Sequence, residues 1–439
     1  MVENERKFDH QNEVSKGQES PYLFLKPETL LSEEEREWVS SASIAHLSPL
    51  WLEKPRDTRR YGGAEDVVMN ILNGLSNFNV KDQELFGNPK DKILEERLPH
   101  FHVHYPAYSE YRSLDLFETL QTDPARAKEL ERHYVFSSYQ EIFRKKHWLS
   151  VVHDHTSYGK DVAYWFSSHI PVVRTEHGAL MPPDNSPLDH AHLERFKDAK
   201  NLWFVAISES QRAQIPDLPW IATVHNGIDP KDFEFSQDKK GDYLLYLGRI
   251  SRTKGPHRAI EVAKALNKPL IIAGHVEQTP ESIAYYKNEV EPELSEKIRH
   301  IPGVDTKVRR QLYRDAKCLL VLGDWQEPFG LVSAEAMMSG TPVVGFNRGA
   351  IPEVIANGLT GYVVDTTDDA IDATAQVLQG EIDPYECRKR AELNFSLDVM
   401  TAKYIKVYKE ARRRFDATNQ ETGWLNFDMI KVDEETSRS

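Results

Sequence analysis

Short apolar runs alternate with amphipathic stretches from Ala42 onward. Each run is only a few residues long and nearly continuous, which is typical of parallel strands covered on both faces by helices. The runs are "SIAHLSP", "WLSVVHDH", "IPVVRTEH", "LWFVAIS", "IATVHNG", "YLLYLGR", "PLIIAGH", "IRHIPG", "CLLVLGD", "TPVVGF" and "GYVVD". Between them lie helical patterns such as "GPHRAIEVAKAL", whose apolar residues recur every three or four positions. The alternation predicts βαβ units, and therefore an α/β fold with parallel sheets.

The segment 226–242, "NGIDPKDFEFSQDKKGD", interrupts this alternation and reads as a linker. We expect two facing Rossmann-like domains with a cleft between them, where the carboxyl ends of both sets of strands meet. The predicted division is a charged N-terminal extension (1–40), a first domain (41–225), the linker, a second domain with a C-terminal helix (243–410), and a polar tail (416–439).

The composition narrows the class of protein. A chain of 439 residues exceeds the usual size of one core, and its 40% hydrophobic and 28% charged residues are ordinary for a soluble protein. The net charge of −14 argues against nucleic acid or anionic lipid as a partner. The two cysteines are too few for a disulfide framework, and no apolar run approaches the ~20 residues of a membrane span. We expect a cytoplasmic protein; its oligomeric state stays open.

The first motif with chemistry is "YLLYLGRISRTKG", a strand followed by Gly248, Arg249 and Lys254. The glycine permits a tight turn, and the two cations can close on a diphosphate. An ordinary surface loop with two exposed cations is the alternative that the motif alone leaves open.

The second motif is "EPFGLVSAEAMMSGTPVVGF", in which a helix is expected to begin at Gly330. Its free N–H groups would form an anion site. Glu335, one turn into the helix, can accept hydrogen bonds from vicinal hydroxyls such as those of a ribose, and Glu327 in the preceding loop can hold a sugar hydroxyl. Taken singly, each glutamate could equally be a first-turn acid or an exposed loop charge.

Together with "RGAIPEVIANGLTGYVVD", these motifs resemble the nucleotide-sugar domain of retaining glycosyltransferases of family 4, over roughly residues 42 to 410. The resemblance implies the GT-B fold. It also implies that Glu327 binds the donor sugar, Glu335 the ribose, and Arg249 with Lys254 the diphosphate. The backbone amides that would assist in donor binding belong to Phe329, Gly330 and Leu331.

The first domain resembles the same family more loosely. "RRYGGAEDVVMNILNGLS" is similar to its Gly-Gly loop, so that Gly62 and Gly63 would approach the donor diphosphate and Tyr61 the acceptor. A pair of glycines alone would be an ordinary turn.

Three histidines follow strands of the first domain. His177 in "PVVRTEHGAL" matches a family histidine near the reacting carbon of the donor, so the resemblance makes it a catalytic candidate with Glu327, Arg249 and Lys254. His153 and His155 in "VVHDHTSYG" are expected to face the cleft as acceptor-site candidates.

The sequence leaves two rival interpretations open. His102 and His104 in "HVH", with His153 and His155, have the spacing of metal ligands along strands and would suit a metal-dependent hydrolase. Further carboxylates at a recognisable spacing are missing, so no metal site is predicted. A sugar-nucleotide epimerase or phosphorylase would keep the two-domain fold, and the second motif favours transfer over both.

The resulting hypothesis is a hexosyltransferase. The resemblance implies that a hexose moves from a nucleotide diphosphate sugar, UDP-glucose or similar, to an unidentified small-molecule or saccharide acceptor with retention of anomeric configuration. No cofactor is expected, because the cations can stabilise the leaving diphosphate without a metal.

Overall fold

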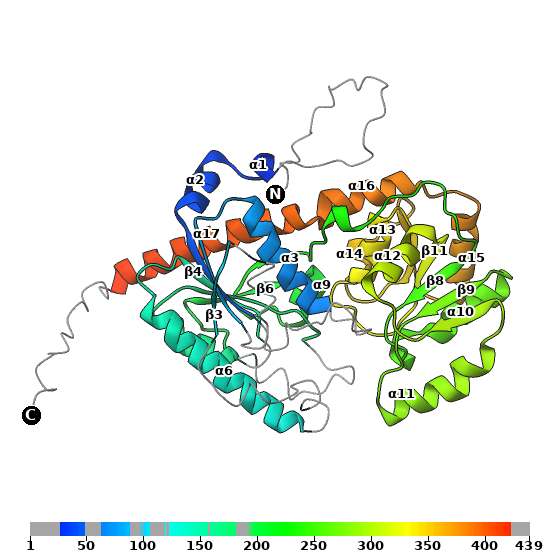
Figure 1. Ribbon diagram of the computed structural model, residues 1–439, viewed down its shortest axis with the longest axis horizontal. Helices are drawn as coiled ribbons and strands as arrows, with labels where there is room; N and C mark the ends of the chain where they lie inside the picture. Colours follow the sequence, from blue (N-terminus) through cyan, green and yellow to red (C-terminus); the bar gives the residue numbers. More distant parts are fainter. Residues whose placement is uncertain are drawn as a thin grey trace, which may run out of the picture.

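The computed structural model describes residues 27–48, 63–87, 98, 100–105, 119, 123–156, 159–180, 193 and 195–422. The described residues contain two all-parallel sheets, and each sheet lies at the centre of its own domain (Figure 1). The predicted α/β class, with two Rossmann-like domains, is confirmed.

The N-terminal sheet has seven strands in the order β3-β2-β1-β4-β5-β6-β7. Their bounds are β1 Ser43–Leu47, β2 Asp82–Phe86, β3 His102–His104, β4 Val151–Asp154, β5 Val172–Thr175, β6 Leu202–Ala206 and β7 Trp220–Thr223. Strands β1, β4, β5 and β6 are buried throughout, which explains their continuous apolar runs.

Helices cover both faces of this sheet. One face packs against α3 (Gly63–Asn77) and α17 (Leu397–Thr422), the other against α6 (Pro124–Arg144) and α7 (Lys160–Phe166). The shorter helices of this half are α1 Pro27–Leu30, α2 Glu33–Ser41 and α9 Glu209–Gln214.

Strands β2 and β3 were not among the predicted strands. "DQELF" begins with three polar residues, and the side chain of Glu84 is nevertheless buried. Lys145 at the end of α6 donates a hydrogen bond of 2.9 Å to Glu84, and His104 of β3 contacts the same carboxylate. An ion pair therefore replaces the apolar contacts that a sequence pattern can detect.

The C-terminal sheet has six strands in the order β10-β9-β8-β11-β12-β13. Their bounds are β8 Leu244–Leu247, β9 Leu270–Ala273, β10 Ile298–Ile301, β11 Cys318–Val321, β12 Val343–Phe346 and β13 Gly361–Val364. The helices around it are α10 Pro256–Ala265, α11 Pro280–Tyr285, α12 Thr306–Asp315, α13 Leu331–Met338, α14 Ile351–Val354, α15 Thr367–Leu378 and α16 Pro384–Phe395. Three-residue 3₁₀ turns lie at Pro230–Asp232, Arg252–Lys254 and Glu291–Glu293, and a π-helical turn at Tyr286–Val290.

The chain passes between the domains twice, and the two passages are hydrogen-bonded to each other. The N–H of Ile228 donates to Phe395 O at 2.9 Å, and the N–H of Leu397 donates to Ile228 O at 2.8 Å. After α16, α17 crosses to the N-terminal domain, packs against it with core residues up to Phe415, and continues as a helix to Thr422, into the region expected to be a polar tail (Figure 1). None of the described helices is both long and apolar enough to cross a membrane.

Candidate active site

A cavity of about 310 Å³ lies between the two domains, at the carboxyl ends of both sheets. The N-terminal domain contributes residues from the start of α3 and from the loop after β5, and the C-terminal domain contributes the two motifs singled out in the sequence. Among the lining residues are Gly63, His177, Gly178, Asn226, Gly248, Arg249, Lys254, Trp325, Glu327, Phe329, Gly330 and Leu331. Most of the predicted site residues therefore share one cavity.

Lys254 and Glu327 form the centre of the C-terminal wall. The Nζ of Lys254 donates a hydrogen bond of 2.9 Å to Glu327 Oε2 and lies 3.6 Å from the centre of the Trp325 ring. The indole Nε1 of Trp325 donates to the same carboxylate oxygen at 2.9 Å. Burial lowers the pKa of Lys254, and the charge of Glu327 acts in the opposite direction. The pair is thus fixed in position by an aromatic residue beside it.

The loop that carries Glu327 is held by the turn after β12. The N–H of Ala350 donates to Glu327 O at 2.8 Å, and the N–H of Gly349 donates to Gln326 Oε1 at 2.8 Å. Gly349 has φ +58°, and a Cβ there would meet the Glu327 backbone N and O at 2.3 Å. Only glycine fits this close approach of two loops.

Arg249 follows β8 on the same wall of the cavity. The hydroxyl of Tyr246 donates to Arg249 O at 2.7 Å, which fixes the turn, and the guanidinium forms an ion pair with Glu277. The Arg249 side chain is 45% exposed, so it remains accessible to a ligand in the cavity. Glu277 was not recognised in the sequence, because nothing in its neighbourhood marks it as a partner of a residue 28 positions away.

The helix predicted at the second motif is α13. Gly330 precedes its first residue with φ +89° and ψ +53°, a left-handed conformation in which glycine is favoured, and a Cβ there would lie 3.1 Å from Ile351 Cδ1. Leu331 and Val332 of the first turn line the cavity. The N-terminal end of the helix, with its unsatisfied N–H groups and positive dipole, is therefore at the cavity wall.

Glu335 lies one turn further along α13, on the wall of a neighbouring cavity of about 290 Å³. Leu331 lines both cavities. The hydroxyl of Tyr313 donates a hydrogen bond of 2.8 Å to Glu335, and Arg309 lies 3.5 Å away. Burial raises the pKa of Glu335, and Arg309 opposes this effect.

His177 lies on the N-terminal wall and contacts His155, which is buried and does not line the cavity as the sequence predicted. The His155 Nδ1 lies 3.0 Å from His177 Nε2, and burial lowers the pKa of His177 to about 4. Burial also lowers the pKa of His155 well below its ordinary value, so both rings are neutral near pH 7. His153 is fully buried between Tyr408 and Thr175, at 2.6 and 2.8 Å, and lies beneath the cavity rather than on its wall.

Of the glycine loop predicted on this wall, the structure describes only Gly63. Gly63 begins α3 and lines the cavity. Tyr61 and Gly62 lie outside the described residues.

The paired histidines do not form one site. His102 and His104 belong to β3 at the edge of the sheet, and two strands, β2 and β1, separate them from β4. His102 lies 3.6 Å from Asp82, and His104 contacts Glu84. The geometry thus contradicts the metal-dependent hydrolase built on these two pairs.

Glu353 forms a polar contact between the two domains. Glu353 of α14 accepts hydrogen bonds from the N–H groups of Glu209 and Ser210, at 2.8 and 2.7 Å, at the start of α9. His225 Nε2 lies 3.0 Å from the same carboxylate. These hydrogen bonds lower the pKa of Glu353 although burial opposes them. The sequence did not reveal this role of Glu353, since its partners lie more than 100 positions away.

The C-terminal domain resembles a known protein family. Residues 228–394 match the family model described as glycosyl transferases group 1. The chain is 31% identical over 214 residues to a glycogen synthase of Mycobacterium tuberculosis, which covers 45% of this chain and 50% of that protein. It is 25% identical over 320 residues to a D-inositol 3-phosphate glycosyltransferase of Mycobacterium avium, covering 63% and 73% respectively. The first three curated relatives are matched over 59%, 44% and 50% of their own lengths.

Solved structures resemble the whole fold. HepE of Anabaena in complex with UDP and glucose superimposes with a TM-score of 0.62 at 15% identity, over 84% of this chain and 100% of that one. AviGT4, a glycosyltransferase involved in avilamycin A biosynthesis, gives a TM-score of 0.58 at 23% identity, over 84% and 98%. At these identities the likeness establishes the GT-B fold.

Proposed function

We propose that the protein transfers a hexose from a nucleotide diphosphate sugar to an acceptor in the cleft, because residues 228–394 match the family model of glycosyl transferases group 1 and the fold is GT-B. UDP-glucose is the donor we favour, since the structural neighbour HepE was solved with UDP-glucose. The transfer retains the anomeric configuration, as the family resemblance implies.

The observation that carries this proposal is the shared cavity that brings Lys254, Arg249 and the N-terminal end of α13 together. When the bond between sugar and phosphate breaks, negative charge grows on the departing diphosphate. Two fixed cations and a helix N-terminus stabilise that charge without reorganisation during the reaction. This is the main contribution we assign to the protein.

The two glutamates have different roles in the proposal. Glu327, beside Lys254, binds a hydroxyl of the donor sugar and keeps it next to the diphosphate. Glu335 accepts the ribose hydroxyls, and its contacts with Tyr313 and Arg309 hold the carboxylate in a defined orientation.

The N-terminal domain supplies the acceptor side. His177 lines the cavity and is neutral near pH 7, so its ring can exchange hydrogen bonds with sugar hydroxyls near the reacting carbon. Rotation of the domains about the two passages at Ile228 and Ser396 would exclude water around the bound substrates. The acceptor we favour is a small molecule or saccharide. We also favour the cytoplasm as the compartment in which the protein acts.

A panel of nucleotide sugars tests the proposal. Each donor is incubated with the full chain, with and without candidate acceptors, and release of the free nucleotide diphosphate is measured. We expect slow hydrolysis of one donor and faster release when an acceptor is present. Binding without release from any donor would reject transfer, and conversion of the sugar without nucleotide release would indicate an epimerase.

Two substitutions then separate the roles of the glutamates. Glu335→Ala should mainly weaken the calorimetric affinity for UDP, and Glu327→Ala should mainly lower kcat. The reverse pattern would contradict the assignment of ribose to Glu335 and sugar to Glu327.

A further inference from the structure

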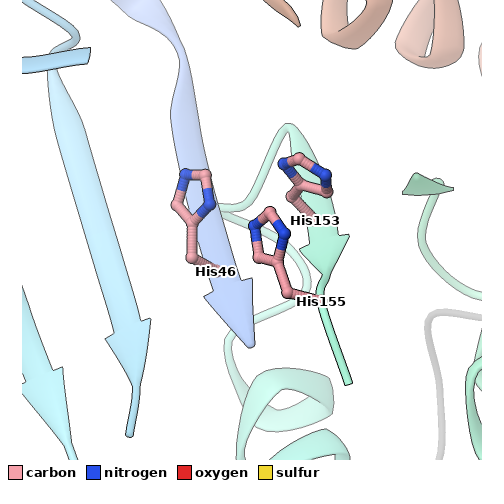
Figure 2. A group of neighbouring side chains, drawn as sticks. All are labelled: His46, His153 and His155. Carbon is pink, nitrogen blue, oxygen red and sulfur yellow. The ribbon is translucent and has the colours of Figure 1, made fainter. Parts of the chain in front are cut away.

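Three histidine rings lie together in the core of the N-terminal domain, beneath the cleft. His46 near the end of β1 is opposite His153 of β4 in the register of the parallel pair, and His155 follows directly after β4. Figure 2 shows the three rings close together, with His46 on β1, His153 on the neighbouring β4 and His155 directly after β4. One ring nitrogen from each lies within 4.8 Å of the others, and all three residues are buried.

Several nitrogens of this cluster have no hydrogen-bond partner among the described residues. They are both nitrogens of His46 and the Nε2 of His155, together with the Nδ1 of His177, the ring in contact with His155. A buried polar atom without a partner costs about 1–3 kcal/mol, so four in one place call for an explanation. A bound ion would satisfy the lone pairs of at least two of them.

We propose that His46, His153 and His155 bind a divalent transition metal ion of the zinc type. Imidazole nitrogen is a preferred ligand of Zn²⁺, Co²⁺ and Ni²⁺, and three histidines with one open position form a known type of zinc site. The metal–nitrogen distance of about 2.0–2.1 Å requires the three nitrogens to move closer by small rotations of the rings.

The protonation of the rings suits this role. Burial lowers the pKa of His46 to about 3 and the pKa values of His153 and His155 well below their ordinary value. Each ring is therefore neutral near pH 7 and keeps a lone pair that can coordinate an ion, as metal binding requires.

Neighbouring side chains already orient two of the rings. His153 contacts Tyr408 through Nδ1 and Thr175 through Nε2, so it can bind the ion with one nitrogen and keep the other contact. If Thr175 is the partner released, its hydroxyl keeps a contact of 2.9 Å with Tyr404. Second contacts of this kind fix the orientation of metal-binding histidines.

The ion would also set the proton on His177, a consequence that rests on the proposed function. A metal on His155 Nε2 leaves the proton on Nδ1, which then donates to His177 Nε2 at 3.0 Å. His177 must in turn carry its own proton on Nδ1, the nitrogen that has no partner among the described residues. The ion would thus fix the tautomer of His177, a ring that lines the cavity.

The test is direct metal binding to the full chain. The protein is stripped with a chelator, incubated separately with Zn²⁺ and Co²⁺, and freed of excess ion. We expect about one ion per chain, a visible d–d absorption band for Co²⁺, and a rise in Tm of the stripped protein on addition of Zn²⁺. Absence of a retained ion together with an unchanged Tm would overturn the proposal, whatever the outcome of the donor panel.

Matched variants locate the ion. His46→Gln and His155→Gln should abolish both the bound ion and the Zn²⁺-dependent rise in Tm. His102→Gln, at an exposed histidine of β3, should change neither. Retention of the ion by a folded His46→Gln protein, or its loss in His102→Gln, would place it elsewhere and reject the site. Should His46→Gln fail to fold, the Co²⁺ spectrum of His155→Gln decides.

Discussion

The ammonium of Lys254 and the carboxylate of Glu327 lie 2.9 Å apart, and the Trp325 indole donates to the same carboxylate oxygen. This relationship joins two parts of the proposed donor site that are 73 positions apart in the chain. The cation suits the phosphate end of a nucleotide sugar and the carboxylate suits its sugar end. A bound donor would therefore have its scissile bond between the two groups.

Removal of either cation should slow transfer. We expect Lys254→Ala and Arg249→Ala to lower kcat by a factor on the order of 10² or more, because in the proposed function each stabilises charge that develops as the diphosphate leaves. The rates are measured by nucleotide release at saturating donor. Lys264→Ala is the matched control, since Lys264 forms an exposed ion pair with Glu293 away from the cavity. Wild-type turnover in both active-site variants would remove the proposed diphosphate clamp.

The pH dependence of kcat/KM should identify Lys254 more specifically. Burial lowers its pKa, so its ammonium loses a proton below the ordinary lysine value of about 10.4. Since the proposed function requires the charged form to bind diphosphate, kcat/KM should fall on the alkaline side below that value. Lys254→Arg should shift this fall to higher pH, because arginine stays charged. An unchanged alkaline limb would assign it to another group.

Gly349 should control the position of Glu327. A Cβ at residue 349 would meet the backbone of Glu327 at 2.3 Å, and its φ of +58° is also unfavourable for alanine. Gly349→Ala should therefore move the Glu327 loop and lower kcat at least tenfold. Gly358→Ala is an informative control: its φ is +76°, but nothing lies within 4 Å of the added Cβ, so it shares the backbone strain without the displacement. Equal kcat values for the two variants would contradict the bracing role.

The contact of Glu353 with α9 should hold the two domains together. Hydrogen bonds to a charged group contribute about 1.5–3 kcal/mol, and the carboxylate accepts two backbone N–H bonds and contacts His225. Glu353→Ala should weaken this contact and favour open conformations, measured as a larger radius of gyration in solution scattering. Glu386→Ala, on α16, removes only a 3.5 Å pair with Lys389 and serves as the control. An unchanged radius in Glu353→Ala would show that other contacts hold the domains.

The sequence predicted those features that depend on neighbouring residues. The apolar run at Val343–Phe346 marks a strand covered on both faces, and Gly330 marks the start of α13 because the turn requires its left-handed conformation. The strand Asp82–Phe86 was not predicted, because its buried Glu84 breaks the apolar pattern. An ion pair with Lys145, at the end of α6, stabilises that buried carboxylate.

Contacts between distant segments gave no local signal. Glu353 meets Glu209 across 144 positions, and His46 meets His153 only through the pairing of β1 with β4. A lone histidine in an apolar strand is indistinguishable from an ordinary core residue until that pairing is known.

The buried histidines should make the protein sensitive to mild acid. The pKa of His46 is lowered to about 3 in the folded state but is about 6.5 in the unfolded chain, so the unfolded state takes up the proton first as pH falls. The contribution of neutral His46 to the free energy of unfolding is fully present above about pH 6.5 and decreases as the pH falls toward the folded pKa. The protonation of His46 in the unfolded chain should therefore lower the free energy of unfolding by about 2 kcal/mol at pH 5 relative to pH 8.

Urea unfolding in the presence of a chelator measures this effect. His46→Leu removes the titrating group, so the difference in the free energy of unfolding between pH 8 and pH 5 should shrink by about 2 kcal/mol. His102→Leu, at an exposed position, should leave that difference at the wild-type value. An equal acid loss in wild type and His46→Leu would mean that His46 is already protonated, or solvent-accessible, in the folded protein.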